Sequence, residues 1–164
     1  MEELLVKLRE WNIPYKKFDH PAVFTCEESD RLCPPMPGAH TKQLLMRDKK
    51  GTRNILLIVM HDKKVHIREL GKILEAKDLS FASPERLKNL LGVEPGSVTP
   101  FGLLFDRDQK VEVIMDQDAW EVGSFRFHPL VNTATLTIDK SSFEAFLAKT
   151  GHAFRTTKIP QKID

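Results

Sequence analysis

The sequence has few cysteines and no long apolar run, and each shortage excludes a class of protein. It holds only 2 Cys among 164 residues, whereas a structural zinc site needs about four ligands in close pairs. The spacing of Cys26 and Cys33 allows a disulfide, but we expect two free thiols because a reducing cytoplasm disfavours disulfides. The longest apolar stretch, residues 55–60, is far shorter than the roughly 20 residues of a membrane-spanning helix.

Signatures of targeting and of common catalytic sites are also missing. The chain begins acidic, at Met1-Glu2-Glu3, without the basic and apolar pattern of a secretion signal. We therefore expect a soluble cytoplasmic protein. There is no Gly-x-Ser-x-Gly elbow, no Walker phosphate loop, and no visible set of nucleophile, base and acid. The 6 His residues lack metal-binding spacing, so we expect neither a metal ion nor a cofactor.

Net charge is small, at +2, but it is unevenly distributed. Residues 40–77 contain ten Lys or Arg against four Asp or Glu, a net +6, whereas residues 106–121 carry a net −4. One end of the molecule would then attract phosphates while another repels them. Solvated faces of hairpins and helices explain the same charges, so both interpretations remain open on charge alone.

Hydrophobic periodicity and turn residues predict a single α+β domain in which helices interrupt a mixed sheet. Gly51 supplies a turn between two apolar runs, which predicts a β-hairpin. Ser83-Pro84 is a typical helix start and Gly92 a typical stop. We expect Ser141 to cap the last helix and the basic tail, residues 155–164, to be loose. The predicted strands are 15–18, 41–47, 54–60, 79–82, 102–105, 111–115, 124–127 and 133–138, and the predicted helices are 2–11, 22–32, 66–74, 84–91 and 141–150.

Lys42 is the first candidate for chemistry. It lies early in the predicted strand 41–47, where Thr41, Gln43 and Leu45 share one face and Lys42 and Leu44 the other. A lysine placed there can project into a cleft as a point-charge donor. An edge-strand lysine that discourages aggregation fits the same pattern.

Two loops are further candidates. In Gly96-Ser97-Val98-Thr99-Pro100, glycine allows unusual backbone shapes and proline fixes the exit, so several N–H groups can converge on an oxygen. A plain connection between helix and strand is the alternative. His128 and Asn132 stand between two predicted strands and can bind a polar ligand, although a hydrogen-bonded structural histidine is commoner. Ala22, Val23 and Phe24 fit either a small side-chain pocket or the core.

Six segments taken together resemble the YbaK/prolyl-tRNA editing superfamily, and the likeness covers nearly the whole chain. The resemblance is strongest to the free-standing alanyl-tRNA(Pro) deacylases. It implies an α+β fold with a mostly antiparallel sheet or partial barrel flanked by helices, and hydrolysis of mischarged Ala-tRNA(Pro). The segments are Phe18-Asp19-His20-Pro21, Thr41-Lys42-Gln43-Leu44, residues 47–51, residues 79–83, residues 96–102 and residues 127–135.

The resemblance also assigns roles to residues. It implies catalytic roles for Lys42, Gly96, Ser97 and His128. It implies substrate contacts for Ala22, Val23, Phe24, Leu32, Gln43, Val98, Thr99, Pro100 and Asn132. Gln43 stands where relatives often have Asn. Binding of the tRNA backbone would fall to Arg47, Lys49, Lys50 and Arg53.

The resemblance also implies a mechanism. The aminoacyl ester is already activated, so the protein places water or the terminal ribose 2′-OH against the ester carbonyl and stabilises the oxyanion that forms. The implied partners are the acceptor end of a mischarged tRNA and, beside it, prolyl-tRNA synthetase or an elongation factor. Three alternatives remain open. They are a deacylase for cysteinyl-tRNA(Pro) or another small amino acid, a non-catalytic tRNA-binding or synthetase-associated module, and a small-molecule or nucleotide-binding protein.

Overall fold

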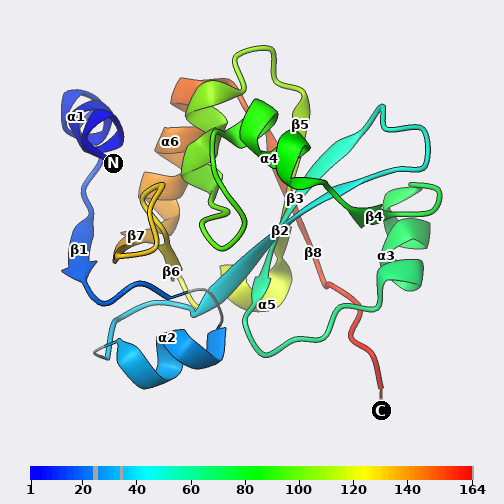
Figure 1. Cartoon of the computed structure of the whole chain (residues 1–164), viewed down its shortest axis with the longest axis horizontal. Helices are drawn as coiled ribbons and strands as arrows, with labels where there is room; N and C mark the ends of the chain where they lie inside the picture. The colour runs from blue at the N-terminus through cyan, green and yellow to red at the C-terminus, as the bar shows by residue number, and fades with distance from the viewer. Residues whose placement is uncertain (24–25, 34, 164) are drawn as a thin grey trace.

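The computed structural model describes residues 1–23, 26–33 and 35–163, and its strands form two sheets (Figure 1). The three-stranded sheet is antiparallel throughout, in the order β1-β7-β6. The five-stranded sheet has the order β4-β2-β3-β5-β8, and its β3–β5 and β5–β8 pairs are parallel. The strands are β1 (Lys16–Asp19), β2 (Thr41–Arg47), β3 (Asn54–Met60), β4 (Ser80–Phe81), β5 (Val111–Asp116), β6 (Ser124–Phe127), β7 (Ala134–Asp139) and β8 (Phe154–Thr157).

The two faces of the five-stranded sheet carry separate hydrophobic cores. One core lies toward the three-stranded sheet and includes Phe125, Phe127, Phe143 and Phe146. The other is closed by α3 and by Ile159. The helices are α1 (Glu2–Glu10), α2 (Cys26–Leu32), α3 (Ile67–Leu74), α4 (Pro84–Leu91), the 3-10 helix η1 (Pro100–Phe105), α5 (Gln117–Trp120) and α6 (Lys140–Thr150). The predicted α+β fold with a mixed sheet is confirmed, and the sheets of the described residues do not close into a barrel. No helix in these residues is both long enough and apolar enough to cross a membrane.

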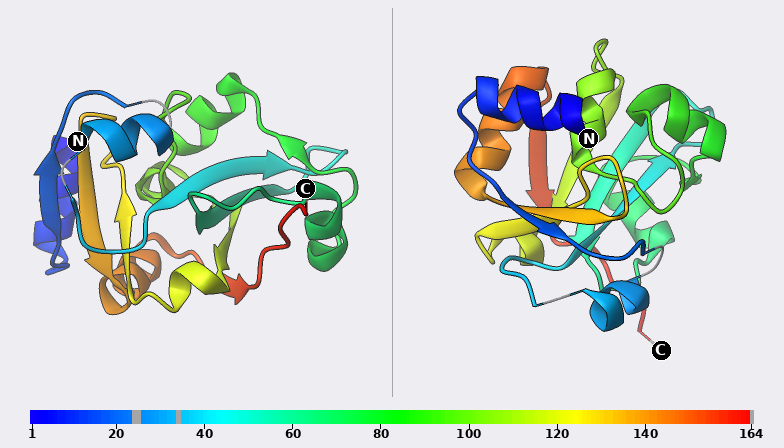
Figure 2. Two further views of the ribbon diagram at one scale, coloured as in Figure 1. Left: turned by 90° about the horizontal axis from the view of Figure 1, so that it is seen from below. Right: turned by 60° about the vertical axis from the view of Figure 1, so that its left-hand side comes forward.

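The predicted hairpin of β2 and β3 has the register expected from the sequence. Thr41 pairs with Met60 and Arg47 with Asn54. The turn is closed by the Asp48 carboxylate, which accepts hydrogen bonds from the N–H groups of Thr52 and Arg53. Strands β2 and β3 are the longest of this sheet. The hairpin extends from β6 toward α3 (Figure 2).

Helix α4 also begins and ends as predicted. The Ser83 hydroxyl accepts a hydrogen bond from the N–H of Arg86, Pro84 is the first helical residue, and Gly92 ends the helix with φ +67°. The cap of α6 was predicted at the wrong residue. Asp139, not Ser141, accepts the hydrogen bond from the N–H of Ser142.

Residues 102–105 are helical, not the strand that was predicted. Thr99 caps η1 through a hydrogen bond from the N–H of Phe101, and Pro100 is the first helical residue. Gly102 packs so closely on α4 that an added Cβ would lie 2.6 Å from the Leu91 carbonyl oxygen. The apolar residues of this segment therefore serve helix packing, which a short apolar run cannot distinguish from a strand.

The C-terminal tail is ordered, which corrects the prediction of a loose segment. Strand β8 pairs in parallel with β5, from Val113↔Phe154 to Asp116↔Thr157. Beyond it, the Ile159 side chain is 1% exposed. The basic residues of the tail suggested solvation, but the buried Ile159 side chain among them anchors the tail to the sheet.

Candidate active site

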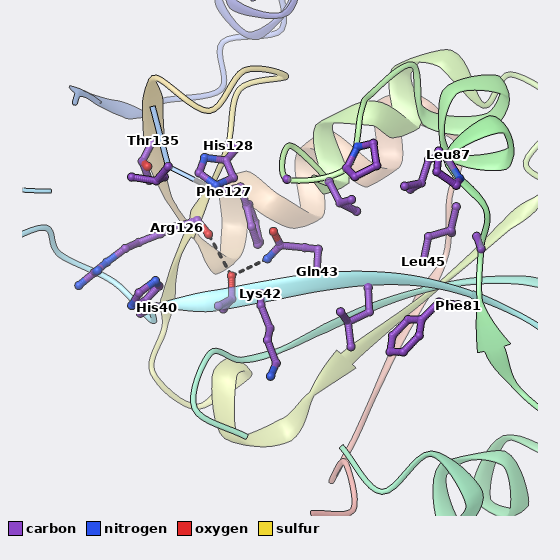
Figure 3. Close-up of a pocket in the computed structure, with 18 of the residues that line it drawn as sticks. His40, Lys42, Gln43, Leu45, Phe81, Leu87, Arg126, Phe127, His128 and Thr135 are labelled. Carbon is purple, nitrogen blue, oxygen red and sulfur yellow. Dashed lines mark hydrogen bonds between the residues drawn. The ribbon is translucent and has the colours of Figure 1, made fainter. Parts of the chain in front are cut away.

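A cavity of about 360 Å³ opens beside the N-terminal half of β2 (Figure 3). Its walls come from residues 40–45, from β4 and the start of α4, from the end of β6, and from Thr135 of β7. The loop before η1 adds Pro95, Gly96 and Val98. The volume of the cavity lies in the ordinary range of small-molecule sites.

The cavity opens at an edge of β2 that is only partly covered. Strand β4 pairs with Met46 and Arg47 alone, and the N–H of Ala82 donates to the Leu45 carbonyl oxygen at 2.8 Å. Because main-chain groups alternate in direction along a strand, the N–H and C=O of Gln43 point to the same side as those of Leu45. In the described part of the chain, no strand pairs with Gln43 on that side.

The side chains of β2 reach the cavity from both faces of the strand. Figure 3 shows Gln43 on one side of β2 and Lys42 on the other. Leu45 packs in the core shared with Phe127, whereas Leu44 packs against the opposite core. The alternation predicted from the sequence is confirmed, and it sets the Lys42 ammonium group apart from the Gln43 side of the cavity.

His128 forms part of the wall on the Gln43 side. Its Nδ1 lies 3.2 Å from the Ala134 carbonyl oxygen. A carbonyl only accepts hydrogen bonds, so Nδ1 carries the proton and Nε2 is the acceptor of the neutral ring. Burial lowers the pKa of His128 and the charge of His20 lowers it further, against the opposing effect of the Ala134 hydrogen bond. The ring is therefore neutral near pH 7.

Beside it, His20 and Thr135 form a fixed polar pair. The Nε2 atom of His20 lies 2.8 Å from the Thr135 hydroxyl, and its Nδ1 lies 2.9 Å from the Pro21 carbonyl oxygen. When the His20 ring is neutral, Nδ1 donates to that carbonyl, so Nε2 accepts the hydroxyl proton of Thr135. The rings of His20 and His128 meet edge-on with centroids 6.4 Å apart. These contacts hold the His20 ring in a fixed orientation beside His128.

The loop before η1 contributes Gly96 and Val98 to the cavity. Gly96 has φ +93°, a conformation that favours glycine, and Val98 packs against the same core as Leu45. Thr99 and Pro100 are buried at the start of η1. Neither they nor Ser97 is among the described residues that line the cavity. Their predicted substrate contact and catalytic role stay predictions.

Of the predicted pocket walls, Val23 lines the cavity and is 2% exposed. Asn132 does not touch the cavity but holds Val23 in place, since its Nδ2 donates to the Val23 carbonyl oxygen at 3.0 Å. Ala22 and Leu32 are exposed and do not belong to the described lining. Phe24 lies outside the described residues.

The predicted tRNA-binding residues surround the hairpin turn. Lys50 is exposed, and Lys49 lies 4.0 Å from the Asp78 carboxylate at the surface. The Arg47 guanidinium donates to the Lys49 carbonyl oxygen and is partly exposed. These three remain candidates for a phosphate interface.

Arg53 is committed to the fold instead. Its guanidinium forms two 2.8 Å hydrogen bonds with the Glu112 carboxylate and donates to the Leu74 carbonyl oxygen. The hydrogen bonds to Glu112 raise the pKa of Arg53. The sequence could not reveal this partner, which lies 59 positions away along the chain. The role of Arg53 in tRNA binding stays a prediction.

Sequence reasoning missed most of the apolar lining and the pair of His20 and Thr135. Met36, Leu87 and Phe127 line the cavity together with Phe81, which is 58% exposed. No three His, Cys, Asp or Glu residues come together as a metal site within residues 1–23, 26–33 and 35–163.

Comparisons with known proteins found a matching family model, similar sequences and similar folds. Residues 20–146 match the family model of the aminoacyl-tRNA editing domain. The chain is 38% identical over 155 residues to prolyl-tRNA synthetase associated domain-containing protein 1 of Xenopus laevis, covering 92% of each chain. It is 30% identical over 158 residues to the prolyl-tRNA editing protein ProX of Acetoanaerobium sticklandii, covering 96% of each. A solved structure of a candidate trans-editing enzyme for prolyl-tRNA synthetase superposes with TM-score 0.72 at 17% identity, covering 98% of this chain and 96% of the other.

Proposed function

The chain belongs to the aminoacyl-tRNA editing domain family, and from that membership we propose that it hydrolyses the ester of mischarged tRNA, with alanine on proline tRNA as the preferred substrate. The prolyl-tRNA names of its relatives support the choice of tRNA. The supporting observation in the structure is the cavity at the uncovered edge of β2, which is large enough for an aminoacyl group and part of its nucleotide.

The cavity suits an ester that needs no strong nucleophile. An aminoacyl ester is activated, so catalysis requires a positioned water or ribose 2′-OH and donors for the developing oxyanion. Main chain is available on two walls, at Gln43 and at Gly96. We assign the carbonyl to the Gly96 loop, because glycine has no side chain and so lines the cavity with main chain. The 2′-OH of the substrate then carries the proton transfer.

His128 serves to recognise the amino group. A neutral imidazole with a free acceptor at Nε2 binds an ammonium group well, whereas a protonated ring repels it. The low pKa of His128 keeps it in the accepting form at neutral pH. This role fits its place beside the fixed pair of His20 and Thr135.

Lys42 serves the nucleotide rather than the ester carbonyl. Its side chain lies on the opposite side of β2 from Gln43 (Figure 3), yet it lines the same cavity. An ammonium group in that position attracts the phosphate of the terminal nucleotide when the acyl group fills the Gln43 side. Arg47, Lys49 and Lys50 extend the basic surface toward the acceptor stem.

Selection among amino acids rests on the apolar walls. A synthetase cannot reject a smaller substrate strongly, because each missing methylene contributes only about 1–3 kcal/mol. A second cavity that holds alanine and excludes proline supplies the remaining discrimination. The apolar wall on the Gln43 side of β2 consists of Leu45, Leu87 and Val98. We assign the side chain of the acyl group to the space between them. Such a protein acts in the cytoplasm beside prolyl-tRNA synthetase or an elongation factor.

The direct experiment is a deacylation panel with proline tRNA charged with Ala, Cys, Ser or Pro. We expect Ala-tRNA(Pro) to be hydrolysed at least about tenfold faster in kcat/KM than Pro-tRNA(Pro). A preference for the cysteinyl or seryl ester would reassign the amino acid but retain the reaction. Binding of tRNA without hydrolysis above the uncatalysed rate would refute the enzyme proposal and support a binding module.

A Lys42→Met variant tests the phosphate contact, with Lys149→Met on α6 as the control for loss of a lysine. We expect Lys42→Met to raise KM and to reduce the slope of log affinity against log salt by about 0.7, the value of one single-strand phosphate contact. Lys149→Met should leave both unchanged. An unaltered KM and salt slope in Lys42→Met would rule out the role given to Lys42.

A further inference from the structure

Phe81 presents an aromatic ring to water at the border of the cavity. Its side chain is 58% exposed, more than that of Phe105 at 40%. A lone exposed apolar side chain needs no special explanation. Phe81 differs because it lines the same cavity as Leu44 and Lys42 of β2. Its exposure therefore concerns a site and not merely the surface.

The backbone of this residue is held in a fixed place. Phe81 pairs with Met46, and the next residue, Ala82, donates its N–H to the Leu45 carbonyl oxygen. Ser83 then caps α4. Strand pairing on one side and a capped helix on the other fix the backbone of Phe81, which reduces the conformational entropy that a ligand must overcome.

Three cavity-lining side chains share the side of β2 that faces away from Gln43, and we call them the Lys42 face. They are Lys42, Leu44 and Phe81. Figure 3 shows Lys42 and Phe81 on this side, and the pairing of Phe81 with Met46 places the ring four residues along the strand from Lys42. At about 3.3 Å per residue this is roughly 13 Å. The order along the face is a cation, an aliphatic side chain and an aromatic ring.

We propose that the Lys42 face binds the single-stranded 3′ end of the tRNA, with the terminal adenine stacked on Phe81. This inference rests on the proposed function, because it assumes that the acyl group fills the Gln43 side. Proteins that bind single strands combine a cationic groove with aromatic side chains, since every base presents a π face. The ammonium group of Lys42 complements the phosphate, and Leu44 provides an apolar floor for the ribose. A nucleotide is therefore a better match to this face than an apolar protein segment, which Lys42 would not favour.

The test combines nucleotide binding with kinetics. The probe is the uncharged trinucleotide CCA, whose dissociation constant is measured by calorimetry for the wild type and for Phe81→Ala, Phe81→Leu and Phe81→Trp. Phe105→Ala is the control for loss of an exposed phenylalanine, and thermal unfolding verifies that each variant is folded. The KM and kcat for Ala-tRNA(Pro) are measured on the same proteins.

We expect Phe81→Ala to weaken trinucleotide binding and to raise KM by about 5- to 150-fold, the range for one stacked base, with kcat nearly unchanged. Phe81→Trp should retain affinity, and Phe81→Leu should lose most of it because an aliphatic side chain does not stack. The inference is overturned if Phe81→Ala binds CCA within twofold of the wild type, if Phe81→Leu binds as well as the wild type, or if Phe105→Ala weakens binding equally. A wild type that binds CCA through Phe81 but hydrolyses no ester would sink the proposed function and leave the nucleotide site standing.

Discussion

Replacing Gly96 by alanine separates the function of the cavity loop from its contribution to stability. Gly96 has φ +93° and Gly123, in the turn before β6, has φ +96°. A left-handed conformation costs alanine about 1–2 kcal/mol. Alanine also lowers the conformational entropy of the unfolded chain, which offsets about 0.4–1 kcal/mol of this cost. Each variant should therefore lose about 1 kcal/mol of stability, or roughly 2–4 °C in Tm for a protein of this size.

The two glycines differ in their surroundings, which makes Gly123→Ala the matched control. An added Cβ at Gly123 has no atom within 4 Å, and Gly123 is not among the residues lining the cavity. Gly96 lines the cavity with the main chain that we assign to the oxyanion. Loss of one oxyanion donor costs about 10²–10³ in kcat in other hydrolases, so a displaced loop should lower kcat by at least about tenfold.

The assay measures Tm by circular dichroism and kcat for Ala-tRNA(Pro) on both variants. We expect similar losses of Tm and a fall in kcat for Gly96→Ala alone. If Gly96→Ala deacylates at the wild-type rate while its Tm falls like that of Gly123→Ala, the loop has no part in catalysis. If neither variant loses stability, the estimate of backbone strain is wrong.

Two further predictions concern titratable groups. Lys63→Met should destabilise the protein by about 3 kcal/mol in urea unfolding, because it leaves the fully buried Asp116 carboxylate without its ammonium partner at 3.0 Å. The double variant with Asp116→Asn should recover part of this loss. A loss below about 1 kcal/mol in Lys63→Met would contradict the reasoning. For His128, the folded pKa is lowered from 6.5 by burial first and by the charge of His20, so its contribution to stability is complete above about pH 6.5 and is lost as pH falls toward the folded pKa. The difference in unfolding free energy between wild type and His128→Asn should therefore shrink from pH 7.5 to 5.5, and the amino-group contact should weaken in parallel; a difference independent of pH would argue against a neutral buried ring.

The sequence alone determined the elements whose signals are local. The hairpin of β2 and β3 follows from two apolar runs and Gly51, and its strands begin and end at the predicted residues. Helix α4 follows from Ser83, Pro84 and Gly92. Alternation along β2 predicted that Lys42 and Gln43 lie on opposite faces, as Figure 3 shows. The resemblance of ordered motifs identified the family, which the match over residues 20–146 confirms.

The tertiary structure alone decided which side chains meet. Arg53 was expected at the tRNA but pairs with Glu112, and no local pattern specifies that choice. The tail was expected to be loose because it is basic, yet parallel pairing with β5 orders it. Thr135 forms a hydrogen bond with His20, which lies 115 positions away in the chain. Phe81 and Lys42 line one cavity only because β4 pairs with β2. Local propensity depends on neighbours in the chain, whereas a cavity is a product of long-range packing, and its lining becomes known only once the sheets and helices have been placed.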